Sequence, residues 1–98
     1  MSDDEMISER YASVWDAISD TPAEALNMQM RSELMVALKK IIKEKGWTQA
    51  EAAKQLGVTQ PRISDLLRGK ISLFGLDSLV NMVAAAGHQV DLKVRDAA

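Results

Sequence analysis

The stretch that decides the fold reads TQAEAAKQLGVTQPRISDLLRGK and covers residues 48–70. Its first half predicts a short helix, because Thr48 and Glu51 form a capping box and Gly57 suits a left-handed position at the helix end. Its second half predicts another short helix that begins after Thr59. Only three residues separate the two helices. Two short helices with so tight a connection predict a helix-turn-helix.

Small and apolar residues are expected to form the inner side of this motif. Ala52 and Ala53 are small where two helices must cross closely. Four larger side chains are expected to seal the seam between the helices: Leu56, Val58, Ile63 and Leu66. Leu67 is expected to face inward as well, and six residues of the second helix are expected to face outward: Gln60, Pro61, Arg62, Ser64, Asp65 and Arg68. A helix with such a polar outer face fits the major groove of DNA, where base edges display distinguishable donors and acceptors.

The reach of these polar side chains suggests a role for each. Gln60 can pair bidentately with adenine, and Arg62 with guanine or a phosphate. Asp65 can accept from a cytosine amino group or hold Arg62 in position, and Ser64 is a short, permissive contact. Five residues are expected to contact the DNA backbone through helix amides, side-chain donors or charge: Thr48, Gln49, Thr59, Arg68 and Lys70. For any one of these residues, an ordinary solvated surface position is the competing interpretation.

The same stretch strongly resembles the Cro/CI-like, or XRE, family of helix-turn-helix regulators. The resemblance covers about residues 31–87 and rests on the Thr-Gln-Ala-Glu start, the Gly57 turn and the Arg-Gly-Lys exit. It implies an all-α, lambda-repressor-like bundle of about five helices that dimerises on operator DNA. By motif position it implies a phosphate clamp at Gln49 and base-facing roles for Gln60, Pro61, Arg62 and Asp65. Pro61 departs from the family's usual polar residue, since a proline can only pack, for example against a thymine methyl group.

The flanking segments narrow the resemblance to antitoxins of the HigA type. These segments are the run Arg31-Ser-Glu-Leu-Met, the acidic arm around Ser13-Val-Trp-Asp and the residues after Gly87. Such antitoxins neutralise a RelE/ParE-like ribonuclease toxin by direct contact and repress their own promoter. The resemblance therefore implies two partners, a double-stranded operator DNA and a toxin.

Charge is distributed unevenly along the chain. Residues 1–29 hold seven acidic residues and one arginine, a net charge of −6, whereas residues 30–98 hold eleven basic and seven acidic residues, a net charge of +4. Such asymmetry often separates two partner surfaces, although both parts could be merely solvated. The expected organisation is an acidic N-terminal arm with a short helical segment at 1–29, a helix-turn-helix DNA-binding domain at 30–87, and a strand and tail at 88–98.

Two further helices are expected outside the motif. Thr21, Pro22 and Glu24 predict the start of a helix whose apolar spacing continues to Lys45. Residues 22–45 could form one helix or two, because Asn27 is a poor interior residue. A last helix is expected after Gly75, with a weak start because glycine offers no side-chain cap. Its buried residues are expected to be Leu76, Leu79, Val80, Met82 and Val83.

The tail changes to the alternating pattern of a β-strand. Val90, Leu92 and Val94 share one side of an extended chain, and polar residues occupy the other. A single strand leaves backbone donors and acceptors unpaired, so the simplest partner is the same strand of a second subunit in a homodimer. Three alternatives stay open: pairing with the sheet edge of another protein, a tail that lies on the body, and a dimer formed through the last helix.

Composition excludes several other classes of protein. Ninety-eight residues suffice for one domain, and the absence of cysteine excludes disulfides and thiolate metal sites. His88 is the single histidine, so we expect no metal site and no cofactor. No nucleophile lies beside a base in a recognisable motif, so we expect no enzyme. The acidic start and the lack of a long apolar run predict a cytoplasmic protein that makes no contact with membranes.

Two hypotheses of different classes therefore remain. The first is a dimeric, sequence-specific DNA-binding repressor that also serves as an antitoxin and regulates its own operon. The second is a protein-interaction module, or a phage-like regulator without a toxin partner. The sequence pI of about 5.3 favours a protein-interaction module whose helix-turn-helix has lost DNA affinity, because DNA-binding domains are usually basic.

Overall fold

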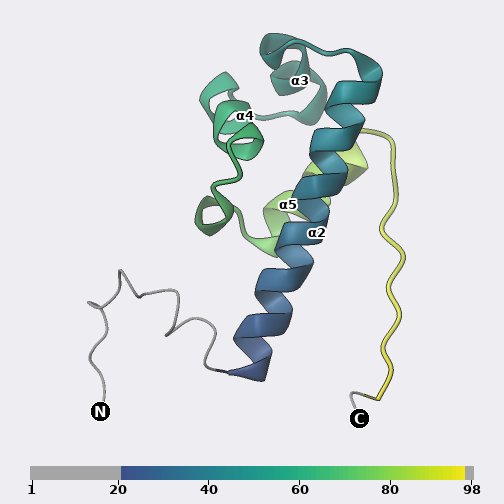
Figure 1. Cartoon of the computed structure of the whole chain (residues 1–98). Helices are drawn as coiled ribbons and strands as arrows, with labels where there is room; N and C mark the ends of the chain where they lie inside the picture. Colours follow the sequence, from purple (N-terminus) through teal and green to yellow (C-terminus); the bar gives the residue numbers. More distant parts are fainter. Residues whose placement is uncertain (1–20, 97–98) are drawn as a thin grey trace, which may run out of the picture. The chain divides into compact units, whose positions relative to one another are not determined.

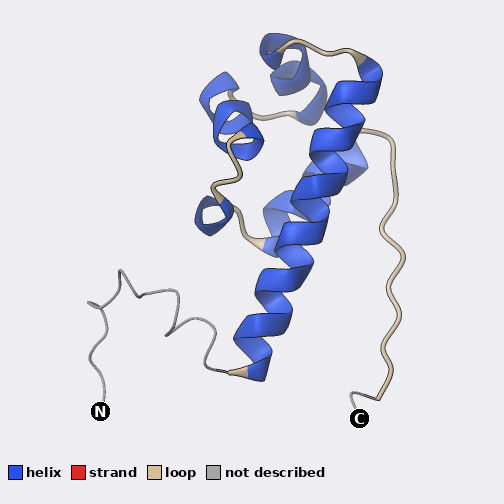
Figure 2. Ribbon diagram, viewed as in Figure 1, coloured by secondary structure: helices blue, strands red, loops and turns tan. Residues whose placement is uncertain are grey.

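The computed structural model describes residues 21–96, and most of these are helical (Figure 1). By internal contacts the chain divides into two units, Met1–Met30 and Arg31–Ala98, and the helix-turn-helix lies in the second. The described part contains four α-helices and one 3-10 turn (Figure 2): α2 (Pro22–Lys45), α3 (Gln49–Leu56), α4 (Gln60–Leu67), η1 (Ile71–Leu73) and α5 (Leu76–Ala85). The helical segment expected within residues 13–20 lies outside the described residues.

Residues 22–45 form one helix, which resolves the alternative left by the sequence. The backbone N–H of Glu24 donates to the Thr21 hydroxyl at 3.0 Å, and that hydroxyl donates to the Glu24 carboxylate at 2.9 Å. This start matches the expected cap. The helix continues through Asn27 because its helix propensity costs only a fraction of about 1 kcal/mol.

The core of the Arg31–Ala98 unit gathers side chains from every helix of that unit. Leu38, Ile63, Leu66, Phe74 and Leu79 are its largest fully buried side chains. Phe74 follows η1 directly, so this short turn delivers the largest side chain of the core. The helices α3 and α4 pack against each other, and α3 also packs against α5.

The connection between α3 and α4 has the geometry that the sequence predicts. Gly57 ends α3 with a φ of 71°, in the left-handed region that a glycine adopts without strain. The Val58 N–H then donates to the Ala53 carbonyl at 3.0 Å, which satisfies a helix-end acceptor. Ala52 and Ala53 are both buried, as close crossing of the two helices requires.

The last helix buries three of the five residues that were expected to be buried. Its N-cap, Gly75, makes no side-chain hydrogen bond, as predicted. Leu79, Met82 and Val83 are buried and Leu76 is half-buried, but Val80 is 42% exposed. Val80 lies beside the buried side of the helix and faces solvent. An apolar residue on a short helix is not necessarily buried, because single exposed apolar side chains are common.

The expected C-terminal strand is not formed, and this prediction was wrong for the chain taken alone. Residues 88–96 contain no strand (Figure 2). A strand is defined by backbone hydrogen bonds to a second strand, and the described elements that could supply them are helices. Val90, Leu92 and Val94 are 43%, 72% and 88% exposed, so the outer part of the tail does not pack on the body either.

Across residues 21–96, every helix is too short or too polar to cross a membrane.

Candidate nucleic-acid interface

The helix α4 has one side fixed in the core and one side open to a ligand. Ile63 and Leu66 are completely buried, which anchors α4 against α3. Gln60 and Pro61 in its first turn are exposed, and so is Arg68 at its end. Ser64 and Asp65 are half-buried. The helix therefore presents a short polar surface on the side opposite to its buried anchor, Ile63 and Leu66.

The helices α3 and α4 both begin at a capping threonine. Thr48 caps α3 in a complete capping box: its hydroxyl accepts from the Glu51 N–H at 3.1 Å, and the Glu51 carboxylate accepts from the Thr48 N–H at 2.8 Å. Thr59 caps α4 by accepting from the Arg62 N–H at 3.4 Å. Gln49 is the first residue of α3 and is exposed. Helix starts of this kind suit phosphate, because amide donors and the helix dipole both favour an anion.

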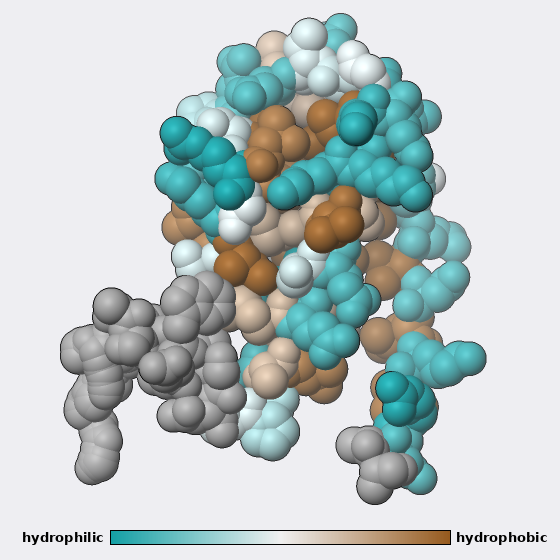
Figure 3. Space-filling view, viewed as in Figure 1, coloured by the Kyte–Doolittle hydropathy of each residue, from teal (hydrophilic) through white to brown (hydrophobic). Residues whose placement is uncertain are grey.

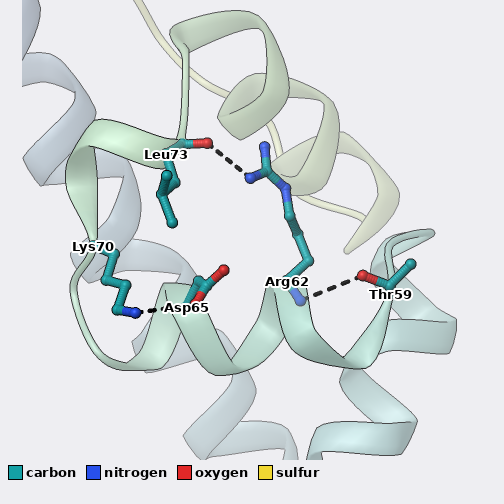
Figure 4. Close-up of polar contacts among 5 residues, drawn as sticks. All are labelled: Thr59, Arg62, Asp65, Lys70 and Leu73. Atoms are coloured by element: carbon teal, nitrogen blue, oxygen red, sulfur yellow. Dashed lines mark hydrogen bonds and ion pairs between the residues drawn. The ribbon is translucent and has the colours of Figure 1, made fainter.

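Arg62 is the predicted site residue whose surroundings differ most from the expectation. Its guanidinium donates to the Leu73 carbonyl at 2.8 Å and to the Ser78 hydroxyl at 3.4 Å. The same group lies 4.2 Å from the centroid of the Phe74 ring. Figure 4 shows the side chain extended toward Leu73. In the free protein, Arg62 is therefore engaged with the protein itself.

Asp65 forms its ion pair with Lys70. The Asp65 carboxylate and the Lys70 ammonium are 3.7 Å apart (Figure 4). The sequence suggested Arg62 as the partner of Asp65, but the Arg62 guanidinium donates to Leu73 and Ser78. An ion pair at the surface contributes only about 0–1 kcal/mol, so DNA can compete for the Lys70 ammonium at small cost.

Sequence reasoning did not place Lys39 beside the predicted site residues. Its Nζ lies 3.9 Å from the position that a Cβ atom would occupy at Gly69. The α2 ammonium is therefore next to the turn that carries Arg68 and Lys70. The signal was the concentration of basic residues between Lys39 and Lys70, but nothing local indicated that α2 and this turn meet.

Figure 3 shows hydrophilic side chains around α3 and α4, with hydrophobic ones exposed between them. Seven of the predicted site residues are exposed: Thr48, Gln49, Thr59, Gln60, Pro61, Arg68 and Lys70. They come from two helix starts, the first turn of α4 and the turn that follows it. Residues 21–96 contain no cluster of side chains suited to a metal ion.

Comparison with known proteins agrees with this geometry. A model of the helix-turn-helix domain family matches residues 17–95. A solved structure named as an XRE family transcriptional regulator superposes with a TM-score of 0.69 at 30% sequence identity, over 74% of this chain and 82% of that one. A search among curated proteins found no match. The chain therefore belongs to the helix-turn-helix domain family and is of the XRE type.

Proposed function

We propose that this protein is a sequence-specific DNA-binding transcriptional repressor that places α4 in the major groove. The single observation that carries this proposal is the two-sided character of α4: Ile63 and Leu66 are fully buried while Gln60 and Pro61 are exposed. A major groove accepts an α-helix and offers base-specific donors and acceptors. The XRE-type membership supports the same role.

Phosphate contacts would hold α4 in register. The starts of α3 and α4 offer backbone amides, and Arg68, Lys70 and Lys39 add positive charge around the turn after α4. Contacts to phosphate position a protein on DNA, whereas contacts to base edges specify the sequence. Gln60, Ser64 and Asp65 are the side chains of α4 that we assign to base edges.

A gel-shift titration with DNA from upstream of the chain's own gene tests this proposal. We expect a discrete complex at low salt whose association constant falls steeply as the salt concentration rises. The reason is that lysine and arginine side chains of the protein displace counterions from the DNA phosphates. Unrelated DNA of the same length should bind more weakly. Equal binding to both DNAs, or no complex at low salt, would remove the proposed function.

We also propose that the protein acts as a homodimer paired through its tail. Val90, Leu92 and Val94 alternate along residues 88–96 and are exposed in the single chain. An unpaired extended segment with an apolar side is a ready template for antiparallel pairing with its own copy. A twofold dimer would place two α4 helices on half-sites about 34 Å apart.

An antitoxin role is the finer part of the proposal. It is supported by the acidic composition of residues 1–29, net charge −6, which suits a small basic partner. Co-expression with the neighbouring gene product tests it: full-length protein should co-purify with that product. A variant that begins at Thr21, the cap of α2, should not retain the product. Retention by the truncated variant would contradict a role for the arm.

The same truncated variant separates the repressor from the protein-interaction module. Removing the acidic residues should leave DNA affinity unchanged or raise it, because negative charge repels DNA. A module that acts only on proteins would bind no DNA in either form.

A further inference from the structure

We infer that Arg62 is a positioning residue, which fixes the recognition helix α4 against η1 and α5 and reads neither a base nor a phosphate. This inference rests on the proposed function. It concerns Arg62 because its guanidinium makes three contacts within the protein.

Three separate interactions hold the Arg62 guanidinium. It donates to the Leu73 carbonyl at 2.8 Å, donates to the Ser78 hydroxyl at 3.4 Å, and lies 4.2 Å from the Phe74 ring centroid. Hydrogen bonds from charged donors are stronger than neutral ones, and a cation over a partly desolvated ring adds further attraction. To reach DNA, Arg62 would have to give up all three interactions and uncover Phe74, which is fully buried.

These contacts add a polar attachment to the apolar one that α4 already has. Ile63 and Leu66 belong to the same buried core as Phe74 and Leu79, and α4 also packs against α3. Arg62 joins the first turn of α4 to the Leu73 carbonyl of η1 and to Ser78 on α5. A helix that is attached both by its buried side and by polar contacts at its first turn has a defined tilt and rotation. The tilt and rotation determine which side chains meet base edges.

A second arginine, Arg31, also binds the segment of residues 71–74 that Arg62 contacts. Arg31 of α2 donates to the Ile71 and Phe74 carbonyls at 3.4 and 3.3 Å. Together the two guanidinium groups bind three carbonyls within residues 71–74. Residues 71–74 are therefore bound to α2 through Arg31 and to α4 through Arg62. These contacts connect α4 to both α2 and α5.

The test compares Arg62→Met with Arg68→Met, a matched loss of one exposed arginine from the end of the same helix. Binding is measured by fluorescence anisotropy at a temperature well below the unfolding midpoint of each variant. The DNAs are the upstream DNA and a panel of its variants, each with one base pair changed. Methionine can still cover the Phe74 ring, so Arg62→Met should remain folded.

We expect Arg62→Met to lower affinity about tenfold, by the same factor for every DNA in the panel. The slope of log K against log salt should stay at the wild-type value. Arg68→Met should instead reduce that slope by about 0.9, the amount for one phosphate contact.

Three results would overturn the inference. Loss of preference at one base pair would make Arg62 a base reader, and a reduction of the salt slope by about 0.9 would make it a phosphate contact. Wild-type affinity in the folded variant would leave Arg62 a structural role only. If Arg62→Met fails to fold, Arg62→Lys takes its place: the uniform loss is expected again, because an ammonium cannot make the same forked contacts.

A measurement without DNA separates this inference from the proposed function. Amide hydrogen exchange in the first turn of α4 should be about tenfold faster in the Arg62 variant, and unchanged in Arg68→Met. Unchanged exchange in the Arg62 variant would overturn the inference even if the wild-type protein binds DNA. Absence of DNA binding by the wild-type protein, with faster exchange in the variant, would overturn the proposed function alone.

Discussion

Gln60 is the clearest base-reading candidate at the scale of single residues. It is exposed in the first turn of α4, and no hydrogen bond within the described part of the chain is assigned to its side chain. Replacing it with alanine should cost about 1–3 kcal/mol of discrimination at one base pair of each half-site, because a bidentate contact to adenine is lost. Affinities for single-base variants of the site, measured by anisotropy, check this prediction.

Lys70 provides the contrast for Gln60, because it can contact phosphate but not a specific base. Lys70→Ala should weaken binding to all variants alike and lower the salt slope by about 0.9. If Gln60→Ala also weakened every variant equally, α4 would not read bases through this residue.

At the scale of elements, the turn between α3 and α4 depends on Gly57. Its φ is 71° and, apart from the glycine and its two chain neighbours, no residue has an atom within 4 Å of the position that a Cβ would take, so an added methyl meets conformational strain but no clash. Gly57→Ala should lower the free energy of unfolding by about 1–2 kcal/mol. Chemical denaturation of the wild-type protein and of this variant measures the change; an unfolding free energy equal to that of the wild type would contradict a strained left-handed residue here.

The start of α5 offers an opposite, stabilising change. Gly75 is the N-cap, with extended backbone angles and no side-chain hydrogen bond. Gly75→Ser adds a hydroxyl that can accept from the first turn of α5, so the unfolding free energy should rise by a few tenths of a kcal/mol. A thermal unfolding midpoint at or below that of the wild type would show that the serine does not cap the helix.

At the scale of the whole molecule, the tail determines the proposed assembly. The double substitution Leu92→Asp and Val94→Asp places charges on the apolar side and should yield monomers at concentrations where the wild type is dimeric. Sedimentation equilibrium distinguishes the two states. Lys93→Asp, on the opposite side of the tail, is the matched control and should remain dimeric. A dimer that survives the double substitution would favour an interface on α5.

The sequence could predict those features that depend on neighbouring residues. The caps at Thr48 and Thr59 and the left-handed Gly57 each depend on residues within one turn, so both helices of the motif were predictable. The hydrogen-bond partners of Arg62 are 11 and 16 residues away in the sequence. Their contact with Arg62 depends on how η1 and α5 pack against α4, which no local pattern indicates. Lys39 reaches Gly69 in the same non-local way. The strand pattern of the tail was visible, but a strand also needs a partner, which one chain does not supply.

The most direct test of α4 in the major groove is dimethyl sulfate protection of the upstream DNA at saturating protein. Guanine N7 lies in the major groove and adenine N3 in the minor groove. We predict that guanine N7 atoms become protected in two half-sites about 34 Å apart, and that adenine N3 atoms there remain reactive. A saturated complex in which all guanine N7 atoms stay reactive, or in which only adenine N3 is protected, would contradict the docking of α4 in that groove.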